Sequence, residues 1–391
     1  MNKILICNES LSHGGLGTYT LNLIEGMQAR GWNVSLLVTD EPGDYFQSAK
    51  EVVAQAYDLS STPLSMKKLL TLVQIIIDQS PDILLLNHCS LSHYALPMLP
   101  QNIKPIAVLH NDIEWIYRVA KRFERRIYRW IAPSDRLKVK FQSMVSRGLG
   151  SRVETIHHGI DTTFHRPREE NSSTKTVVFI GNLGQNKGAD LLPAIFRNVV
   201  SELPDVQFSI IGEGALYADL LTQCREAHLN AELTGYIPKV DVFRRLRNAN
   251  ILILPTRVEG FGLVIAEAMS CGVVPVVSCL SGVTDTIVDD GKTGILVTQD
   301  DVTAFAVSVL RLLKNPPLLR SMSGAARQTA VRRFSVDRML DNYEKVFYSK
   351  DDRGSLPQRQ TAGWVSELAV EMMRKGFNTK WFVRRLQEFL K

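Results

Sequence analysis

The sequence predicts an α/β protein with two domains, each built on a parallel β-sheet flanked by helices. Short apolar runs that end in polar or glycine-rich segments recur along both halves of the 391-residue chain, with helical patterns between them. Runs without alternation are typical of parallel strands that are buried on both faces. Residues 166–176, rich in Pro, Glu, Asn and Ser, interrupt the pattern as a polar linker does. The chain is long enough for each domain to bury its own core.

Composition and cysteine usage narrow the class of protein. Hydrophobic residues make up 45% of the chain and charged residues 22%, which is ordinary for a globular protein, and no apolar run has the length of a membrane span. The start of the chain reads as a strand rather than as a signal peptide. The five cysteines are scattered without a C-x-x-C pair, which is typical of a reducing compartment and disfavours a zinc site. We therefore expect a cytoplasmic protein.

The most informative stretch of the chain is residues 251–279. It reads as a buried strand, a polar loop with glycines, a helix that begins at Leu263 and is stopped by Gly272, and a second buried strand. In such a unit the helix N-terminus lies at the carboxyl end of the strand, where its N–H groups and dipole favour an anion such as phosphate. Glu259 in the loop and Glu267 on the helix can face one crevice, which suits a ligand that is part phosphate and part polyol. The alternative is an ordinary amphipathic helix with two solvated carboxylates.

These residues resemble a known family. The segment 259–263 (EGFGL), followed by Glu267, is similar to the E-x7-E signature of the retaining family 4 glycosyltransferases. Members of that family have two Rossmann-like domains that face each other across a cleft, an arrangement called the GT-B fold. The resemblance implies that Glu259 binds hydroxyls of the donor sugar and that Glu267 binds ribose hydroxyls. It also implies that the N–H groups of Gly262 and Leu263 hold the diphosphate.

The resemblance covers about residues 1–348 and implies the domain organisation. Residues 1–165 are expected to form an amino-terminal acceptor domain, and residues 176–333 a carboxy-terminal domain that binds the nucleotide sugar. Residues 334–350 resemble a helix that crosses back to the amino-terminal domain. Residues 351–391 lie beyond the resemblance, and their apolar stripes beside basic residues predict a helical extension. We expect this extension to pack on the amino-terminal domain, with a membrane contact or an oligomer seam as the alternatives.

The second half departs from the family pattern at one position. The loop that follows an apolar run at 177–180 carries Lys187, which matches a family lysine that clamps the diphosphate of the leaving nucleotide. Asn182 stands where the family has an arginine, and an amide supplies neither the charge nor the bidentate fork. Neutralisation of the phosphates is then expected to rest on Lys187 and the helix dipole, with His110 or Arg257 as further candidates.

Two further expectations concern the base and the cofactor. Ile237 lies in a segment that resembles the one whose backbone and apolar side chain hold the nucleotide base. No pair of carboxylates of the D-x-D type occurs at a strand end, so neither a metal ion nor another cofactor is expected. The nucleotide sugar itself would be a substrate.

The first half contributes a glycine-rich turn and a histidine. Gly14 and Gly15 open the helix after the first strand and resemble the family's first glycine-rich loop, which faces the donor phosphates and the acceptor. His110 follows a buried strand and matches the family's histidine at that place, which implies contact with donor or acceptor. The alternative is a structural histidine held by its neighbours. His88 and His93 are weaker candidates.

One segment of the first half is strongly basic. Residues 101–150 carry 11 basic and 4 acidic side chains. Within them, the pattern of residues 114–130 predicts a helix with aromatic anchors and a basic face, as in helices that lie on an anionic membrane. A nucleic acid would also attract this face, but no recognisable binding module accompanies it. The alternative is a solvated charged face.

Taken with the resemblance, these residues predict a retaining glycosyltransferase. It would transfer a hexose-like sugar from a nucleoside diphosphate to a hydroxyl of a saccharide or lipid-linked acceptor, in the synthesis of cell envelope, exopolysaccharide or lipopolysaccharide. Two alternatives stay open: a sugar-nucleotide epimerase or phosphorylase on the same fold, and a nucleotide-sugar-binding protein without turnover. An oxidoreductase fits poorly because neither glycine loop has the full dinucleotide fingerprint.

Overall fold

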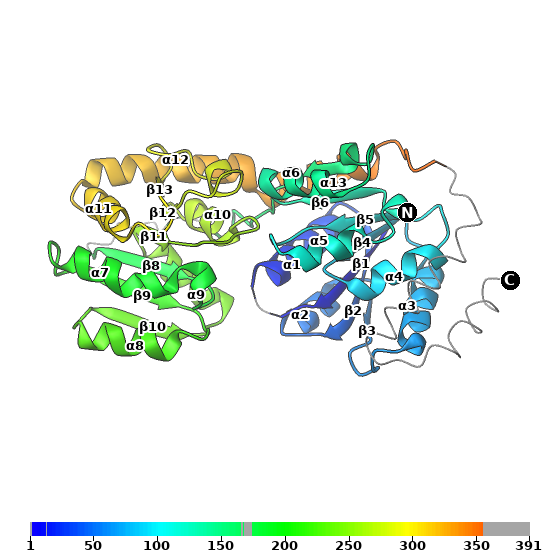
Figure 1. Cartoon of the computed structure of the whole chain (residues 1–391), viewed down its shortest axis with the longest axis horizontal. Coiled ribbons are helices and arrows are strands. Elements are labelled where there is room, and N and C mark those ends of the chain that lie inside the picture. Colours follow the sequence, from blue (N-terminus) through cyan, green and yellow to red (C-terminus); the bar gives the residue numbers. More distant parts are fainter. Residues whose placement is uncertain (1, 13, 166, 168–173, 355–391) are drawn as a thin grey trace. The chain divides into compact units, whose positions relative to one another are not determined.

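The computed structural model describes residues 2–12, 14–165, 167 and 174–354, which fold into two compact units (Figure 1). Unit 1 contains the chain through Pro133, the segment Lys138–Ile156 and the chain from Leu340. Unit 2 contains Ser134–Leu137 and His157–Met339. The predicted helical extension over 351–391 lies outside the described residues from position 355 onward.

Unit 1 is built on a seven-stranded parallel sheet of order β3-β2-β1-β4-β5-β6-β7. Its strands are β1 (Lys3–Ser10), β2 (Asn33–Glu41), β3 (Gln55–Asp58), β4 (Ile83–Asn87), β5 (Lys104–Val108), β6 (Arg129–Ala132) and β7 (Val153–Thr155). Its helices are α1 (Gly15–Ala29), α2 (Tyr45–Val52), α3 (Met66–Gln79), α4 (Ser90–Ala95), α5 (Glu114–Lys121) and α6 (Asp135–Met144), the last of which starts in unit 2. Every residue of β4 is buried, as expected for a central strand that is covered on both faces.

Unit 2 is built on a six-stranded sheet of order β10-β9-β8-β11-β12-β13, also parallel. Its strands are β8 (Thr176–Ile180), β9 (Gln207–Ile211), β10 (Ala231–Gly235), β11 (Ile251–Leu254), β12 (Val274–Ser278) and β13 (Ile295–Val297). Its helices are α7 (Leu192–Val200), α8 (Tyr217–Glu226), α9 (Lys239–Arg247), α10 (Leu263–Ser270), α11 (Val302–Leu313) and α12 (Pro316–Phe334). The strand, loop, helix and strand predicted over 251–279 form as β11, α10 and β12.

The parallel topology decides where functional side chains can gather. In each sheet all strands run in one direction, so their carboxyl ends and the loops that follow them lie at one edge of that sheet. Among the residues that the structure describes, none of the helices combines the length and the apolar character that crossing a membrane requires.

The chain returns to unit 1 within α13 (Val336–Phe347). Arg30 pairs with Asp341 at 2.8 Å and with Glu344 at 2.7 Å, and the indole N–H of Trp32 donates to Glu344 at 3.0 Å. Residues 157–165, which we expected in the amino-terminal domain, belong instead to unit 2, where Ile160 forms a bridge with Ser335.

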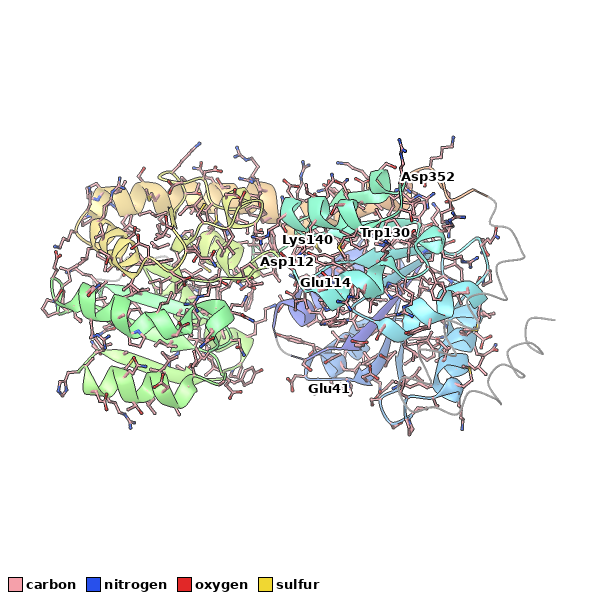
Figure 2. The ribbon with its side chains drawn as sticks, viewed as in Figure 1. Glu41, Asp112, Glu114, Trp130, Lys140 and Asp352 are labelled. Carbon is pink, nitrogen blue, oxygen red and sulfur yellow. The ribbon has the colours of Figure 1, made fainter. Side chains whose placement is uncertain are left out.

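The prediction of one amphipathic helix over 114–130 is wrong. Helix α5 has only eight residues, Phe123 adopts a left-handed conformation with φ 54°, and β6 begins at Arg129. Ile127 and Trp130 are fully buried, and Trp130 is labelled in Figure 2. The apolar residues were thus those of a short helix followed by a buried strand, with no glycine or proline between them to mark the change.

Several basic side chains of this region have structural roles. The buried guanidinium groups of Arg129 and Arg152 pair with Asp352 at 2.9 and 3.1 Å (Asp352 is labelled in Figure 2). Arg353 donates to the carbonyl oxygens of Ile103 and Gln101 at 2.9 and 3.0 Å. Arg129, which belongs to the basic segment 101–150, therefore helps Arg152 to fix the returning chain to unit 1.

Candidate functional site

Unit 2 brings Lys187 and Glu259 together from loops that follow adjacent strands. Lys187 ends a short 3-10 turn (Gln185–Lys187) after β8, and Glu259 lies in the loop after β11. Lys187 Nζ lies 2.5 Å from Glu259 Oε1, with 28% of the lysine side chain and 8% of the glutamate side chain exposed. A charge pair this sheltered from water is strengthened by the low local dielectric. The lysine retains enough exposure to meet an anion that enters from solvent.

Backbone contacts fix the two loops to each other. The N–H groups of Arg257 and Val258 donate to Asn186 O at 2.8 and 3.2 Å, and the Thr256 hydroxyl lies 3.1 Å from the same oxygen. Gly188 adopts φ 67°, and a Cβ there would lie 1.9 Å from Pro255 O. Only glycine permits this close approach, which holds Lys187 beside the loop of Glu259.

Arg257, a candidate for phosphate neutralisation, is engaged elsewhere. Its guanidinium forms a bidentate contact with Asp190 at 2.7 and 2.9 Å, and its Nε lies 2.7 Å from Asp300 Oδ1. The hydrogen bonds to Asp190, and then those to Asp300, raise the pKa of Arg257 above its ordinary value against the opposing effect of burial. Two carboxylates therefore already compensate its charge, and it braces the loop rather than presenting a charge to a ligand.

Helix α10 starts beside Glu259 with its N-terminal N–H groups directed into this loop region. Gly262 precedes the helix with φ 95° and ψ 54°, a conformation that L-residues rarely adopt, and it has no side chain with which to cap the helix. The neighbouring Phe261 is 2% exposed, and its ring stacks on His157 with centroids 5.5 Å apart. The role of Gly262 and Leu263 as backbone donors to an anion stays a prediction.

Glu267 faces a histidine that the sequence analysis did not single out. Its Oε1 lies 3.7 Å from His165 Nε2, and the two side chains are 16% and 4% exposed. The other ring nitrogen of His165, Nδ1, donates to Asp161 O at 2.9 Å. His165 belongs to the segment 157–165 that folds onto unit 2, so no local pattern in the sequence pointed to the pairing.

Asn182 and Ile237 lie in loops that share a partner, Glu213. Leu183 N donates to Glu213 O at 2.7 Å, and Tyr236 N donates to Glu213 Oε1 at 3.4 Å. Asn182 is exposed and Ile237 half-buried. The two predicted residues thus sit at the ends of β8 and β10, on either side of the turn that follows β9.

In unit 1, His110 is buried at the end of a hydrogen-bonded chain of side chains. Its Nε2 lies 3.2 Å from Asn87 Oδ1, Asn87 Nδ2 donates to Asn8 Oδ1 at 3.2 Å, and Asn8 Nδ2 donates to Thr20 Oγ1 at 3.2 Å. Asn8 and Asn87 are the residues that face each other at the carboxyl ends of β1 and β4. The loop after His110 is anchored by Asp112, which accepts from Tyr117 OH at 2.9 Å and pairs with Lys140 at 2.5 Å (Figure 2).

The glycine-rich turn of unit 1 takes the expected place at the start of α1. Gly14 precedes the helix with φ 105°, Gly15 is its first residue, and residue 13 lies outside the described chain. Gly17 is an addition to the prediction, because a Cβ there would lie 2.3 Å from the ring of Tyr45. The close approach of Tyr45 and of the backbone of Ser12 therefore requires glycine at this position.

His88 is a strained neighbour of His110. It has φ 46°, and its ring lies 4.8 Å from that of His110 and 6.1 Å from that of Trp115. Its buried Nε2 has no hydrogen-bond partner among the described residues. Burial, and secondarily His93, lower the pKa of His88 to about 4, so its ring is neutral near pH 7.

The structure gathers the predicted residues into two groups, one in each unit. Unit 2 holds Lys187, Asn182, Ile237, Glu259, Gly262, Leu263 and Glu267; unit 1 holds Gly14, Gly15 and His110. Among the described residues, no three His, Cys, Asp or Glu side chains are grouped so that they could hold a metal ion.

Comparisons with known proteins identify the family. The family model described as glycosyl transferases group 1 matches residues 161–329, and the one described as glycosyltransferase family 4 matches residues 13–164. The chain belongs to the group 1, family 4 glycosyltransferases. The glycosyltransferase prediction is therefore confirmed.

Relatives of this glycosyltransferase align over most of its length. It is 28% identical over 376 residues to the phosphatidyl-myo-inositol mannosyltransferase of Mycobacterium leprae, covering 90% of this chain and 98% of the relative. It is 23% identical over 287 residues to the N-acetyl-alpha-D-glucosaminyl L-malate synthase of Bacillus anthracis, covering 67% of this chain and 75% of the relative.

Solved structures confirm the predicted GT-B fold. S. aureus TarM, solved with fondaparinux, alpha-GlcNAc-glycerol and UDP, has a TM-score of 0.77 at 14% identity, over 89% of this chain and all of that one. Anabaena HepE, solved with UDP and glucose, has a TM-score of 0.76 at 17% identity, over 90% of this chain and all of that one. At these identities the likeness shows the fold.

Proposed function

We propose that this glycosyltransferase is a retaining hexosyltransferase that uses a nucleoside diphosphate sugar as its donor. The observation that carries the proposal is the sheltered pair of Lys187 and Glu259 beside the N-terminus of α10. A cation and a helix N-terminus suit a diphosphate, and a buried carboxylate suits the hydroxyls of a sugar. The UDP present in the TarM and HepE structures supports a nucleotide donor.

The proposed reaction assigns a separate task to each group. The bond between the anomeric carbon and the phosphate oxygen breaks, and its electron pair stays on the diphosphate. Lys187 and the N–H groups of Gly262 and Leu263 stabilise this charge as it develops. Glu259 orients the sugar and Glu267 the ribose. The acceptor oxygen bonds to the anomeric carbon on the face that the diphosphate leaves, and the acceptor's proton passes to the departing diphosphate oxygen. We assign no side chain as a nucleophile.

The same proposal covers substrate class and location. We propose a hydroxyl of a saccharide or lipid-linked molecule as the acceptor, a role in the synthesis of cell envelope or extracellular polysaccharide, and a cytoplasmic enzyme that needs neither a metal ion nor another cofactor. The printed names of the two relatives describe transfer to a phosphatidyl-inositol and to L-malate, which supports hydroxyl-bearing acceptors of low molecular weight. Thermal stabilisation by a panel of nucleotide sugars would identify the donor, because a ligand that binds the folded state raises stability by mass action.

The first prediction tests the donor site. Lys187→Ala should lower consumption of the identified donor by about 100-fold, the scale of losing one group that stabilises the developing charge. Glu259→Gln should lower it as well, because a neutral amide orients the sugar hydroxyls less strongly than a carboxylate. Donor consumption with and without acceptor is the measurement.

A second lysine–glutamate pair provides the matched control. Lys314 and Glu202 form an ion pair whose side chains are 47% and 56% exposed, so Lys314→Ala and Glu202→Gln make the same chemical changes in water. These variants should retain the activity of the parent. If Lys187→Ala consumed the donor as fast as the parent, the proposed site would be wrong.

The exposed amide of Asn182 favours a second candidate, a protein that binds the nucleotide sugar without turning it over. Lys187 alone would then supply too little positive charge to stabilise the departing diphosphate. Tight donor binding by the parent, with neither hydrolysis nor transfer to any acceptor in a cell extract, would support this candidate over the transferase.

A further inference from the structure

The hydrogen-bonded chain of side chains that ends at His110 begins at the Thr20 hydroxyl, whose role as donor or acceptor in each contact can be determined. The Thr20 hydroxyl donates its single proton to the backbone carbonyl of Leu16 at 2.8 Å, a group that can only accept. Thr20 Oγ1 must therefore accept from Asn8, which makes the nearer atom of Asn8 its amide nitrogen. The same nitrogen also reaches Ser10 O at 3.5 Å, again a group that only accepts.

The first hydrogen bond determines which atom donates in each of the following ones. With its nitrogen turned to Thr20, Asn8 presents its oxygen to Asn87 and accepts from that residue's amide nitrogen. Asn87 in turn presents its oxygen to His110 Nε2. Because an amide oxygen only accepts, the His110 nitrogen that faces it carries a proton.

Burial makes this chain costly to disrupt. Asn8, Thr20 and Asn87 are fully buried, and His110 is 6% exposed. A buried polar group that loses its partner costs about 1–3 kcal/mol, so Asn8, Asn87 and Thr20 are tolerated here because each satisfies the next.

The rings around His110 hold the imidazole in the plane that this chain requires. Tyr19 meets it edge to face at 5.0 Å, and His88 meets it at 4.8 Å with an interplanar angle of 86°. Tyr19 is itself held by a hydrogen bond of 2.5 Å to the hydroxyl of Tyr343. A half-turn of the imidazole would place Cε1 where Nε2 lies and break the contact with Asn87.

We propose that Asn87, Asn8 and Thr20 are positioning residues that hold His110 in one orientation with a proton on Nε2. The placement of this proton follows from the hydrogen bonds within unit 1, whereas its effect on sugar transfer rests on the proposed function. This hydrogen-bonded chain gives a reason for the two asparagines, Asn8 and Asn87, near the ends of otherwise apolar strands.

The titratable groups that face His110 do not add charge near neutral pH. The pKa of His88 is lowered to about 4 by burial and then by His93. The pKa of Tyr19 is raised, first by burial and then by Tyr343, and burial also raises that of Tyr343. These three side chains therefore do not account for a change in the titration of His110 when the hydrogen-bonded chain is mutated.

The first test is spectroscopic and does not depend on catalysis. In the full-length protein labelled with 15N-histidine, the signals of His110 are assigned by their loss in His110→Gln. The parent should show a protonated Nε2 whose proton exchanges slowly. In Asn87→Asp the carboxylate should raise the pKa of His110 by at least about one unit. An unprotonated Nε2 in the parent, or an unchanged His110 titration in Asn87→Asp, would overturn the proposal.

The second test uses Thr20, which lies two links away from His110. Thr20→Val keeps the shape of the side chain but removes the hydroxyl, so exchange of the His110 proton should accelerate and kcat should fall about tenfold, with a smaller change in KM for the donor. Thr20→Ser keeps the hydroxyl and should restore both readings. Parent-like proton exchange in Thr20→Val would count against the proposal. Loss of activity in Thr20→Val with an unchanged His110 signal would also contradict the proposed role of the hydrogen-bonded chain. Failure of the proposed function would show separately, as absence of donor consumption by the parent protein.

Discussion

At the scale of single residues, His93 links stability to pH. Its Nδ1 donates to Cys89 O at 2.9 Å, its ring is 2% exposed, and its Nε2 has no hydrogen-bond partner among the described residues. The pKa of His93 is lowered to about 4, chiefly by burial, against the effect of the bond to Cys89 and with a further lowering by Arg122. A proton therefore binds the unfolded chain more tightly than the folded one.

The second prediction follows from the sign of this shift. Because the folded-state pKa lies below the ordinary value of about 6.5, the contribution of His93 is complete above that pH and is lost as the pH falls toward 4. Between pH 7 and pH 5 the loss should be about 2 kcal/mol. His93→Gln, which retains a donor for Cys89, should reduce this difference in urea unfolding measured at the two pH values. The exposed His228→Asn is the control, and a pH dependence equal to that of the parent in His93→Gln would contradict the assignment.

Single residues also show where sequence reasoning reached the site and where it stopped. Glu259 and Lys187 could be predicted because each lies in a loop directly after a buried strand, and adjacent parallel strands bring such loops together. Asn8 and Asn87 could not be paired from the sequence, since their contact depends on the register between β1 and β4, 79 positions apart. His165 was missed because its contact with Glu267 also depends on tertiary structure. The segment 157–165, which carries His165, folds as part of unit 2, where Glu267 lies.

At the scale of elements, the turn that carries Lys187 depends on one close backbone approach. A Cβ on Gly188 would lie 1.9 Å from Pro255 O, a backbone atom that cannot rotate away. Gly291 has a similar φ, 70° against 67°, but a Cβ there would meet nothing within 4 Å. Comparing substitutions at the two glycines therefore distinguishes the cost of the left-handed backbone conformation, which both share, from the cost of the contact with Pro255 O, which only Gly188 has.

The third prediction uses this pair. Gly188→Ala should destabilise the protein by about 3 kcal/mol, the upper range for forcing extra volume into a packed site, and should also weaken donor binding by moving Lys187. Gly291→Ala should cost about 1 kcal/mol, from the left-handed conformation alone, and leave donor binding unchanged. Unfolding midpoints and donor titrations give both quantities. Equal destabilisation by the two substitutions would show that the contact with Pro255 is relieved without cost.

Periodicity was a sufficient guide to most elements but failed where two of them meet without a turn signal. In the segment 114–130, apolar residues recur at a spacing that fits a helix of four turns. The chain instead leaves the helix near Phe123 and enters β6, and Ile116 from the helix is buried, as are Ile127 and Trp130. A short buried strand has the same apolar run as a buried helix, and only the sheet beside it decides between them.

At the scale of the whole molecule, the positive side chains differ in whether they are buried in ion pairs or exposed to solvent. The net charge of +6 includes buried arginines of unit 1 whose charge is compensated by a carboxylate. Arg129 and Arg152, for example, both pair with Asp352. Arg118 and Arg125 in the same region are exposed. Nearby, Trp115 and Ile113 expose 47% and 42% of their surface. A contact with an anionic membrane would therefore depend on these exposed residues rather than on a continuous amphipathic helix.

The fourth prediction concerns that membrane contact, which stays a prediction. The full-length protein should float with vesicles that contain anionic lipid, less at high salt than at low salt, because screened charges at a surface lose most of their attraction. Reversing two charges with Arg118→Glu and Arg125→Glu should abolish flotation, whereas the same reversal at the exposed Lys292 and Arg311 of unit 2 changes net charge equally and should leave it intact. Equal binding of the parent to neutral and anionic vesicles would exclude an electrostatic contact through this region. Equal losses in both double variants would show that net charge, rather than the region around Trp115, sets the affinity.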